Sequence, residues 1–225
     1  MPVMSVKSDR EIQEDVLKEL RWDSRIRQAE VGVEVDDGVV TLTGTVDNWA
    51  KKLAAREAAH RVVGVRDVAD DVRVKLPGSL QLTDTEIAQG VRFALEWNAF
   101  VPDQDIRSTV SDGFVTLEGK VYTLRQAEDA AKAIRAVRGV KGVNNWLTVA
   151  VVKADPEKLR KSIEEALQRR AEREAEKIQV TVGDGVVTLA GRLRTWPQKT
   201  AVLGAVSHAP GVREVRDRLE VRPWG

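Results

Sequence analysis

Hydrophobic and polar residues along this chain follow two periodicities, one helical and one alternating, and the same order of these patterns occurs three times. A stripe of apolar residues three or four positions apart comes first, as in a helix with one buried face. Two alternating runs follow, then an alanine- and valine-rich stretch at helical spacing, then a last alternating run. The pattern predicts three units with the element order α-β-β-α-β. The first-helix stripes are Ile12, Val16 and Leu20; Ile87, Val91 and Leu95; and Leu159, Ile163 and Leu167.

A nine-residue phrase joins the first two strands of each unit. It reads DDGVVTLTG at 36–44, SDGFVTLEG at 111–119 and GDGVVTLAG at 183–191, so the copies are 75 and 72 residues apart. An Asp-Gly pair accepts positive φ angles, which predicts a tight hairpin turn. We expect the closing glycine, which has no side chain, to let the second helix approach the sheet closely.

Helix start signals fix where the units begin. Ser8, Thr83 and Asp155 precede the first helices, and each side chain can accept a hydrogen bond from an orphan backbone N–H. The chain is therefore predicted to be an α+β protein made of tandem two-layer α/β sandwich units. Each unit should hold a three-stranded mixed sheet, with helices on one face and the other face uncovered. The units are repeat 1 at 8–76, repeat 2 at 83–152 and repeat 3 at 155–223.

Composition and charge narrow the class of protein. Hydrophobic residues make up 42% of the 225 residues and charged residues 32%, which is typical of a soluble globular protein. The absence of cysteine excludes disulfides and thiol catalysis. The net charge is +1, and the repeats carry −3, −1 and +3 in chain order, so we expect no nucleic acid as a partner. The first residues lack the apolar core of a signal peptide and no stretch is long enough to span a bilayer, which predicts a cytoplasmic protein.

No catalytic or metal-binding constellation stands out. His60 and His208 each lie alone in a predicted second helix, without the partners that catalysis or metal ligation requires. The aspartates of the repeated phrase are explained by their hairpin turns, which offer too few oxygen ligands for calcium. Asp70 and Asp71, without a matching pair in the other repeats, are interpreted as solvated strand surface. We therefore expect no enzymatic activity, no cofactor and no metal.

Tryptophan is unusually frequent, with six residues against one tyrosine and three phenylalanines. Two pairs are equivalent between repeats, at the end of the first helix and at the start of the second, and one further residue should point away from its own core on a last strand. Packing between repeats and contact with a membrane interface or partner are both compatible with these positions. A charged stretch at 169–177 extends the first helix of repeat 3 and could contact anionic lipid. The candidate contact residues are Trp22, Trp97, Trp146, Trp49, Trp196, Arg169, Arg170 and Arg173.

The combined pattern resembles the BON domain, which is named from bacterial osmotically inducible and nodulation proteins. The resemblance rests on the element order, the Asp-Gly-Val-Val-Thr-Leu-x-Gly phrase and the later Gly-Val-x-x-Val, and it covers all three repeats. It implies a non-enzymatic domain of bacterial stress and envelope proteins, with proposed phospholipid binding and with potassium binding in one relative. Many relatives are exported, whereas no export signal is recognised at the start of this sequence.

We therefore expect a non-enzymatic binding or scaffold protein of this type, linked to osmotic stress, that contacts a phospholipid membrane surface or a protein partner. Short linkers predict repeats that pack on one another. The alternative is a cytoplasmic small-cation sensor in which bound potassium closes the repeats on one another. The sequence alone does not choose between lipid, ion and protein as the ligand.

The cation-sensor alternative makes its own prediction. A ligand that binds only the native state raises the melting temperature, so potassium should stabilise the protein more than sodium at the same concentration. Thermal melts followed by circular dichroism in the two salts measure this difference. Equal melting temperatures would remove the alternative.

Overall fold

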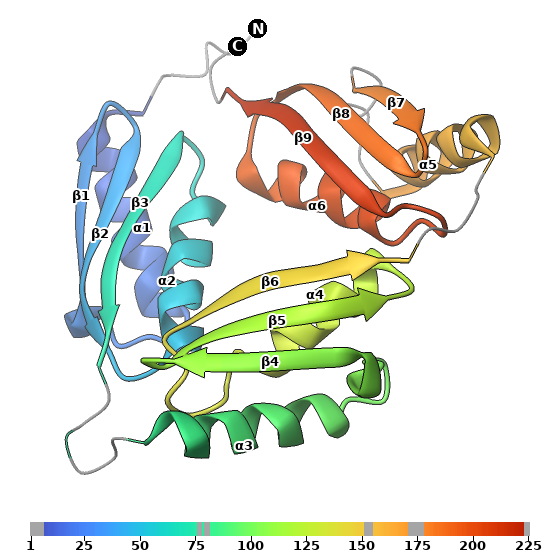
Figure 1. Ribbon diagram of the computed structural model, residues 1–225. Coiled ribbons are helices and arrows are strands. Elements are labelled where there is room, and N and C mark those ends of the chain that lie inside the picture. The colour runs from blue at the N-terminus through green and yellow to red at the C-terminus, as the bar shows by residue number, and fades with distance from the viewer. Residues whose placement is uncertain (1–6, 76–77, 79–81, 151–154, 171–177, 223–225) are drawn as a thin grey trace, which may run out of the picture. The chain divides into compact units, whose positions relative to one another are not determined.

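The computed structural model of this 225-residue chain describes residues 7–75, 78, 82–150, 155–170 and 178–222, and it contains the predicted order of elements in each repeat (Figure 1). Repeat 1 holds α1 (Asp9–Trp22), β1 (Val31–Asp36), β2 (Val39–Val46), α2 (Trp49–Arg61) and β3 (Asp67–Val74). Repeat 2 holds α3 (Asp84–Glu96), β4 (Ile106–Ser111), β5 (Phe114–Val121), α4 (Leu124–Ala133) and β6 (Gly142–Val149). Repeat 3 holds α5 (Pro156–Arg170), β7 (Gln179–Gly183), β8 (Val186–Leu193), α6 (Trp196–Ser207) and β9 (Glu214–Val221).

Each repeat forms a separate three-stranded sheet, with the hairpin's second strand in the centre. The strand orders are β1-β2-β3, β4-β5-β6 and β7-β8-β9. The hairpin strands pair antiparallel in all three sheets, and the last strand pairs parallel with the central strand in repeats 1 and 2. The expected mixed sheet and the α+β fold class are therefore confirmed.

Both helices of a repeat lie against one face of its sheet, and the core is between them (Figure 1). In repeat 1, Val40, Leu42 and Val46 of β2 are buried, whereas the residues that alternate with them are more exposed. The predicted first-helix stripes are buried in all three repeats. Ser8 and Thr83 cap α1 and α3 as expected. Each forms a capping box, because the third residue of the helix is a glutamate whose side chain accepts a hydrogen bond from the backbone N–H of the capping residue.

The hairpin turns have the predicted geometry. The aspartates Asp37, Asp112 and Asp184 have φ angles of 47°, 51° and 50°, and the glycines that follow them have φ angles of 76°, 80° and 75°. Two successive residues with positive φ make the turn that matches the right-handed twist of a hairpin. Glycine and aspartate tolerate this region, so the turn is encoded locally.

The closing glycine of the phrase makes a different contact from the one we expected. A Cβ on Gly44 would lie 2.1 Å from the backbone oxygen of Glu30, and one on Gly119 would lie 2.1 Å from that of Asp105. These oxygens belong to the last residues of two short 3₁₀ turns, η1 (Gln28–Glu30) and η3 (Asp103–Asp105), each of which directly precedes the first strand of its repeat. The close neighbour is therefore the backbone of this turn rather than the second helix. The φ angles of 125° and 136° add a second reason for glycine.

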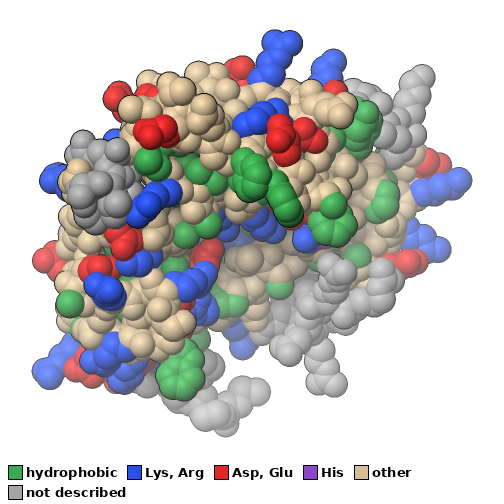
Figure 2. Space-filling view, turned by 90° about the horizontal axis from the view of Figure 1, so that it is seen from below, with side chains coloured by type: hydrophobic (Ala, Val, Ile, Leu, Met, Phe, Trp, Pro, Cys, Tyr) green, Lys and Arg blue, Asp and Glu red, His purple; other side chains and the backbone are tan. Residues whose placement is uncertain are grey.

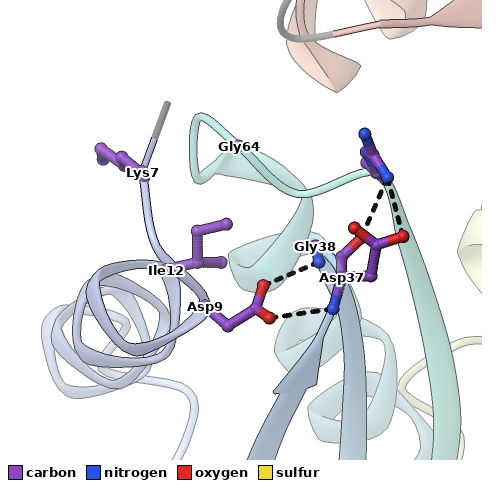
Figure 3. Close-up of a pocket in the computed structure, with 7 residues that line it drawn as sticks. Lys7, Asp9, Ile12, Asp37, Gly38 and Gly64 are labelled. Atoms are coloured by element: carbon purple, nitrogen blue, oxygen red, sulfur yellow. Dashed lines mark hydrogen bonds and ion pairs between the residues drawn. The ribbon is translucent and has the colours of Figure 1, made fainter. Parts of the chain in front are cut away.

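A carboxylate at the first helical position holds the hairpin turn in repeats 1 and 2. Asp9 accepts hydrogen bonds from the backbone N–H of Asp37 (2.9 Å) and of Gly38 (2.8 Å), and Figure 3 shows its two oxygens directed at these groups. Asp84 makes the equivalent bonds in repeat 2, at 2.8 and 2.9 Å. Repeat 3 has Pro156 at this position and lacks a carboxylate there. The first helix and the turn are thus tied together in two of the three repeats.

A small pocket of about 60 Å³ lies beside this carboxylate in repeat 1. That volume suits roughly two water molecules. The carboxylate oxygens that border the pocket are already hydrogen-bonded to the turn, and Arg66 pairs with Asp37 at 3.1 Å. We therefore regard the pocket as part of the helix–turn junction. It is lined by Lys7, Asp9, Ile12, Asp37, Gly38, Gly64 and Arg66.

Repeat 1 carries a network of charges that joins α1 to α2. Asp23, directly after α1, pairs with Arg25 at 2.7 Å and with Arg61 of α2 at 3.3 Å, and Arg61 also pairs with Glu19 of α1 at 3.0 Å. The Asp23 side chain is almost fully buried beneath these guanidinium groups. Hydrogen bonds from Arg25 are the main reason why the pKa of Asp23 falls from 3.8 to about 2, and Arg61 lowers it further against the opposing effect of burial.

The glycine contact predicts a large effect of one methyl group. Gly119→Ala should destabilise repeat 2 by at least about 3 kcal/mol, because the new Cβ meets a backbone oxygen and the φ angle is unfavourable. Urea denaturation with hydrogen exchange to localise the loss measures this effect. Gly183→Ala is the control, since a Cβ there meets no atom within 4 Å. Equal stability of the two variants would contradict the account.

The lowered pKa of Asp23 predicts a pH-dependent contribution to stability. The charged carboxylate contributes fully above about pH 4, and its contribution is lost as the pH falls to about 2. Asp23→Asn should lower the free energy of unfolding near pH 7 by about 1–2 kcal/mol, since the partly exposed guanidinium groups weaken the interaction. Urea titrations at several pH values should show the difference from the wild type shrinking below pH 4. A difference that stays constant down to pH 2 would contradict this assignment.

Candidate functional site

The two tryptophans at the ends of the first helices are among the most exposed large apolar side chains. Trp22, the last residue of α1, is 88% exposed, and Trp97, the residue that caps α3, is 75% exposed. Both follow the last residue of a buried stripe by two positions, Leu20 in one repeat and Leu95 in the other. Helical geometry therefore turns them away from the core of their own repeat.

In repeat 2 two further exposed aromatic residues are near this tryptophan in the sequence, and we call Phe93, Trp97 and Phe100 the aromatic patch. Phe93 is 59% exposed, Phe100 is 76% exposed, and the rings of Phe93 and Trp97 lie 5.4 Å apart between centroids. Phe93 and Trp97 are four residues apart and so share one side of α3. Figure 2 looks onto the molecule from below Figure 1, where α3 is drawn, and shows hydrophobic side chains gathered at the surface on that side.

The loop that carries Phe100 is held in place by polar contacts. The Asn98 side chain accepts a hydrogen bond from the backbone N–H of Phe100 at 3.1 Å. Arg92 of α3 donates to the backbone oxygens of Asp103 (2.9 Å) and Ile106 (3.3 Å) and pairs with the Glu96 carboxylate at 3.1 Å. These contacts fix the loop against α3, so the exposure of the aromatic patch is a property of a well-connected segment.

The surroundings of Trp22 in repeat 1 are basic instead of aromatic. Arg21 and Arg27 flank it on the chain, and both are exposed. Neither guanidinium group has an ion pair within the part of the chain that the structure describes, whereas Arg25 nearby is held by Asp23. The first-helix end of repeat 1 therefore has a tryptophan with exposed arginines nearby in the sequence, and that of repeat 2 has three exposed aromatic residues.

The other candidate residues lie elsewhere in their repeats. Trp146 is 64% exposed on β6 and points away from its own core, as its alternation predicts. Trp49 and Trp196 occupy the first positions of α2 and α6, where Trp49 is half-buried and Lys199 lies 5.3 Å from the centroid of the Trp196 ring. The contact role of all these tryptophans stays a prediction.

The arginines of the charged stretch fall partly outside the structure. Arg169 and Arg170 are in the last turn of α5, without described side chains, and Arg173 lies outside the described residues. Their predicted role in lipid contact therefore has no geometry to support it.

The interpretation of Asp70 and Asp71 as solvated strand surface is wrong for Asp70. Asp70 does not face solvent, because its side chain lies 3.6 Å from the Lys52 ammonium group on the helix-covered side of the sheet and is only 12% exposed. Asp71 is exposed, as expected. Among the described residues, no group of three or more histidines, aspartates or glutamates is arranged to hold a metal ion. None of the described helices is both long and apolar enough to cross a membrane.

Sequence reasoning missed Phe93 and Phe100 as members of the patch. The signal was present for Phe93, since it falls between Val91 and Leu95 of the buried stripe and a helix must turn it outward. Phe100 is in a loop, whose direction is set by the contacts of Asn98 and Arg92 and not by a periodic pattern.

Comparison with known proteins relates the chain to one family. The profile of the BON domain matches residues 8–75, 83–151 and 155–223. Osmotically-inducible protein Y of Escherichia coli (strain K12) is 32% identical over 116 residues, which are 48% of this chain and 58% of that protein. The chain thus spans somewhat more than half the length of this relative.

Solved structures give only distant similarity. The C-terminal domain of CdsD, a structural protein of the type III secretion system of Chlamydia trachomatis, aligns over 96% of this chain and 100% of its own, with 15% identity and a TM-score of 0.27. The periplasmic domain of PrgH aligns over 93% of this chain and 99% of its own, with 13% identity and a TM-score of 0.23. No conclusion about function follows from scores this low. The profile matches, which cover nearly the whole chain, do decide the family: this chain belongs to the BON domain family and carries three copies of the domain.

Proposed function

We propose that this chain is a non-enzymatic binding protein, linked to osmotic stress, that contacts the surface of a phospholipid membrane through the ends of its first helices. The observation that carries the proposal is the exposure of Trp22 and of the aromatic patch of repeat 2. The similarity to osmotically-inducible protein Y supports the link to osmotic stress.

The aromatic patch supplies the apolar contribution to binding. Tryptophan and phenylalanine suit the boundary between lipid headgroups and acyl chains. Burying one such side chain fully gains roughly 1.5–3 kcal/mol, so three rings that are already partly covered supply roughly 3–6 kcal/mol before the cost of association. That range corresponds to weak, reversible attachment.

The helix end of repeat 1 supplies the preference for anionic lipid. Arg21 precedes Trp22 in the sequence and Arg27 follows it by five residues, and each cation close to an anionic surface gains about 1 kcal/mol. Repeat 2 lacks this preference at its helix end, because Arg92 is paired with Glu96 and Asp103. We therefore expect the two repeats to contribute different parts of the binding free energy, one electrostatic and one apolar.

Vesicle co-sedimentation of the intact chain tests the proposal. Binding should be stronger to vesicles with about 30% anionic phospholipid than to neutral vesicles, and it should weaken at high salt. Replacing both Trp97 and Phe100 by serine should reduce binding at least about tenfold to either kind of vesicle. Replacing Arg21 and Arg27 by glutamine should remove the anionic preference.

Tyr122→Ser is the matched control, since Tyr122 is a 61% exposed aromatic residue of repeat 2 outside the patch. It should bind vesicles like the wild type. Absence of binding to anionic vesicles at low salt would overturn the proposal. A loss of binding that is equal for the Tyr122 control and the patch variant would also contradict it.

A further inference from the structure

The face of the repeat 2 sheet that points away from α3 and α4 carries two exposed aromatic rings. On β5, Val115, Leu117 and Val121 are buried toward the helices, so the residues alternating with them form the other side. Phe114 is 52% exposed and Trp146, paired beside Glu118, is 64% exposed. We call this side the outer face of repeat 2, and it is formed by Arg107, Phe114, Thr116, Glu118, Lys120 and Trp146.

The backbone of β6 supports one of these rings. A Cβ on Gly142 would lie 2.9 Å from the Phe114 ring, so the ring rests directly on the glycine of the neighbouring strand. Phe114 therefore lies against the sheet instead of standing out from it. The outer face of repeat 2 therefore carries the Phe114 ring, packed on the backbone, at one end and the Trp146 ring four residue pairs further along.

The equivalent sheet faces of the other repeats carry different side chains at the same strand positions. The position of Trp146 is taken by Asp71 in repeat 1 and by Arg218 in repeat 3. The outer face of repeat 1 also exposes the carboxylates of Glu34, Asp36 and Asp67, none of which has an ion pair with another described residue. A face with this charge repels its own copy, whereas the outer face of repeat 2 combines aromatic rings with a nearly balanced charge.

The charged residues of the outer face of repeat 2 are self-complementary, so that two copies of the face can pair opposite charges. Glu118 and Lys120 are two positions apart on β5, point to the same side, and have no ion pair within the described part of the chain. A two-fold axis that lies in the plane between two such faces, and runs across the direction of β5 between these residues, places each carboxylate opposite the ammonium group of the other copy. Closed two-fold symmetry is the commonest arrangement of identical chains, and it requires a self-complementary surface of this kind.

We propose that this protein forms a homodimer in which the outer faces of repeat 2 from two chains pack against each other. Trp146, which is paired with Glu118 and therefore lies close to the axis, is the apolar anchor. Glu118 and Lys120 fix the register through reciprocal ion pairs. Phe114, four positions further from the axis on β5, lies outside this contact. A membrane is the less suitable occupant, because three charged side chains in the middle of the face would lose their hydration in it. This surface is separate from the helix ends proposed to contact lipid.

The dimer is expected to be weak. β5 and β6 are eight residues long and β4 is six, so strands about 4.8 Å apart give at most roughly 350 Å² of sheet per chain, less than half of the surface in a stable interface of standard size. Association should therefore depend on concentration, and it should weaken in salt because the register pairs lie near solvent.

Charge reversal across the pair gives the sharpest test. In sedimentation velocity runs without vesicles, the full chain at about 100 µM and low salt should show a dimer. Glu118→Lys and Lys120→Glu should each raise the dissociation constant at least about tenfold, since each variant faces two like-charge contacts across the axis. An equal mixture of the two variants should associate again, because one chain then carries two cations and the other two carboxylates.

Two further variants test the aromatic anchor and its control. Trp146→Thr should weaken the dimer at least about tenfold. Val39→Ser, which changes the position equivalent to Phe114 in repeat 1, should leave it unchanged. Far-UV circular dichroism checks that every variant is folded. The proposal is overturned if the wild type stays monomeric, if either single reversal dimerises like the wild type, or if the mixture fails to recover; none of these outcomes depends on vesicle binding.

Discussion

Two helices cover only one face of each three-stranded sheet, and this one-sided burial is the constraint on which the rest of the structure depends. The apolar stripes of the helices and the inward-facing strand residues, such as Leu20 and Leu42, are buried and form the core in each repeat. A domain of about 70 residues has too little chain to cover the other face of its sheet with a further layer. Outward positions are consequently free to differ, as Asp71, Trp146 and Arg218 show at one equivalent site.

The hairpin turn and the first helix are joined by contacts that follow directly from the local sequence. Positive φ angles at Asp37 and Gly38 create the hairpin, and Asp9 binds the two backbone N–H groups that the turn leaves open. Repeat 3 has Pro156 in place of this carboxylate. The shared phrase is therefore explained by folding, and we look for function where the copies depart from one another.

Much of this architecture could be predicted from the sequence because it is encoded locally. Stripes, caps and Asp-Gly turns act over three to five residues, and the structure confirms them in all three repeats. Contacts between distant segments were not predictable in the same way. The partner of Gly44 is the backbone of Glu30, and Asp70 turns toward Lys52, because the three-dimensional fold decides which segment lies nearby. The aromatic patch of repeat 2 was found only in part, since the contacts of Asn98 determine where Phe100 points.

The central claim is that outward aromatic residues at the first-helix ends perform the binding, while the shared turns and cores only build the domain. Hydrogen exchange of the intact chain, measured by mass spectrometry with and without anionic vesicles, tests this claim most directly. The account predicts slower exchange in residues 18–27 and 92–101, with the hairpin turns at 36–38, 111–113 and 183–185 unchanged. Protection confined to the hairpin turns, or no protection anywhere while the protein is vesicle-bound, would contradict it.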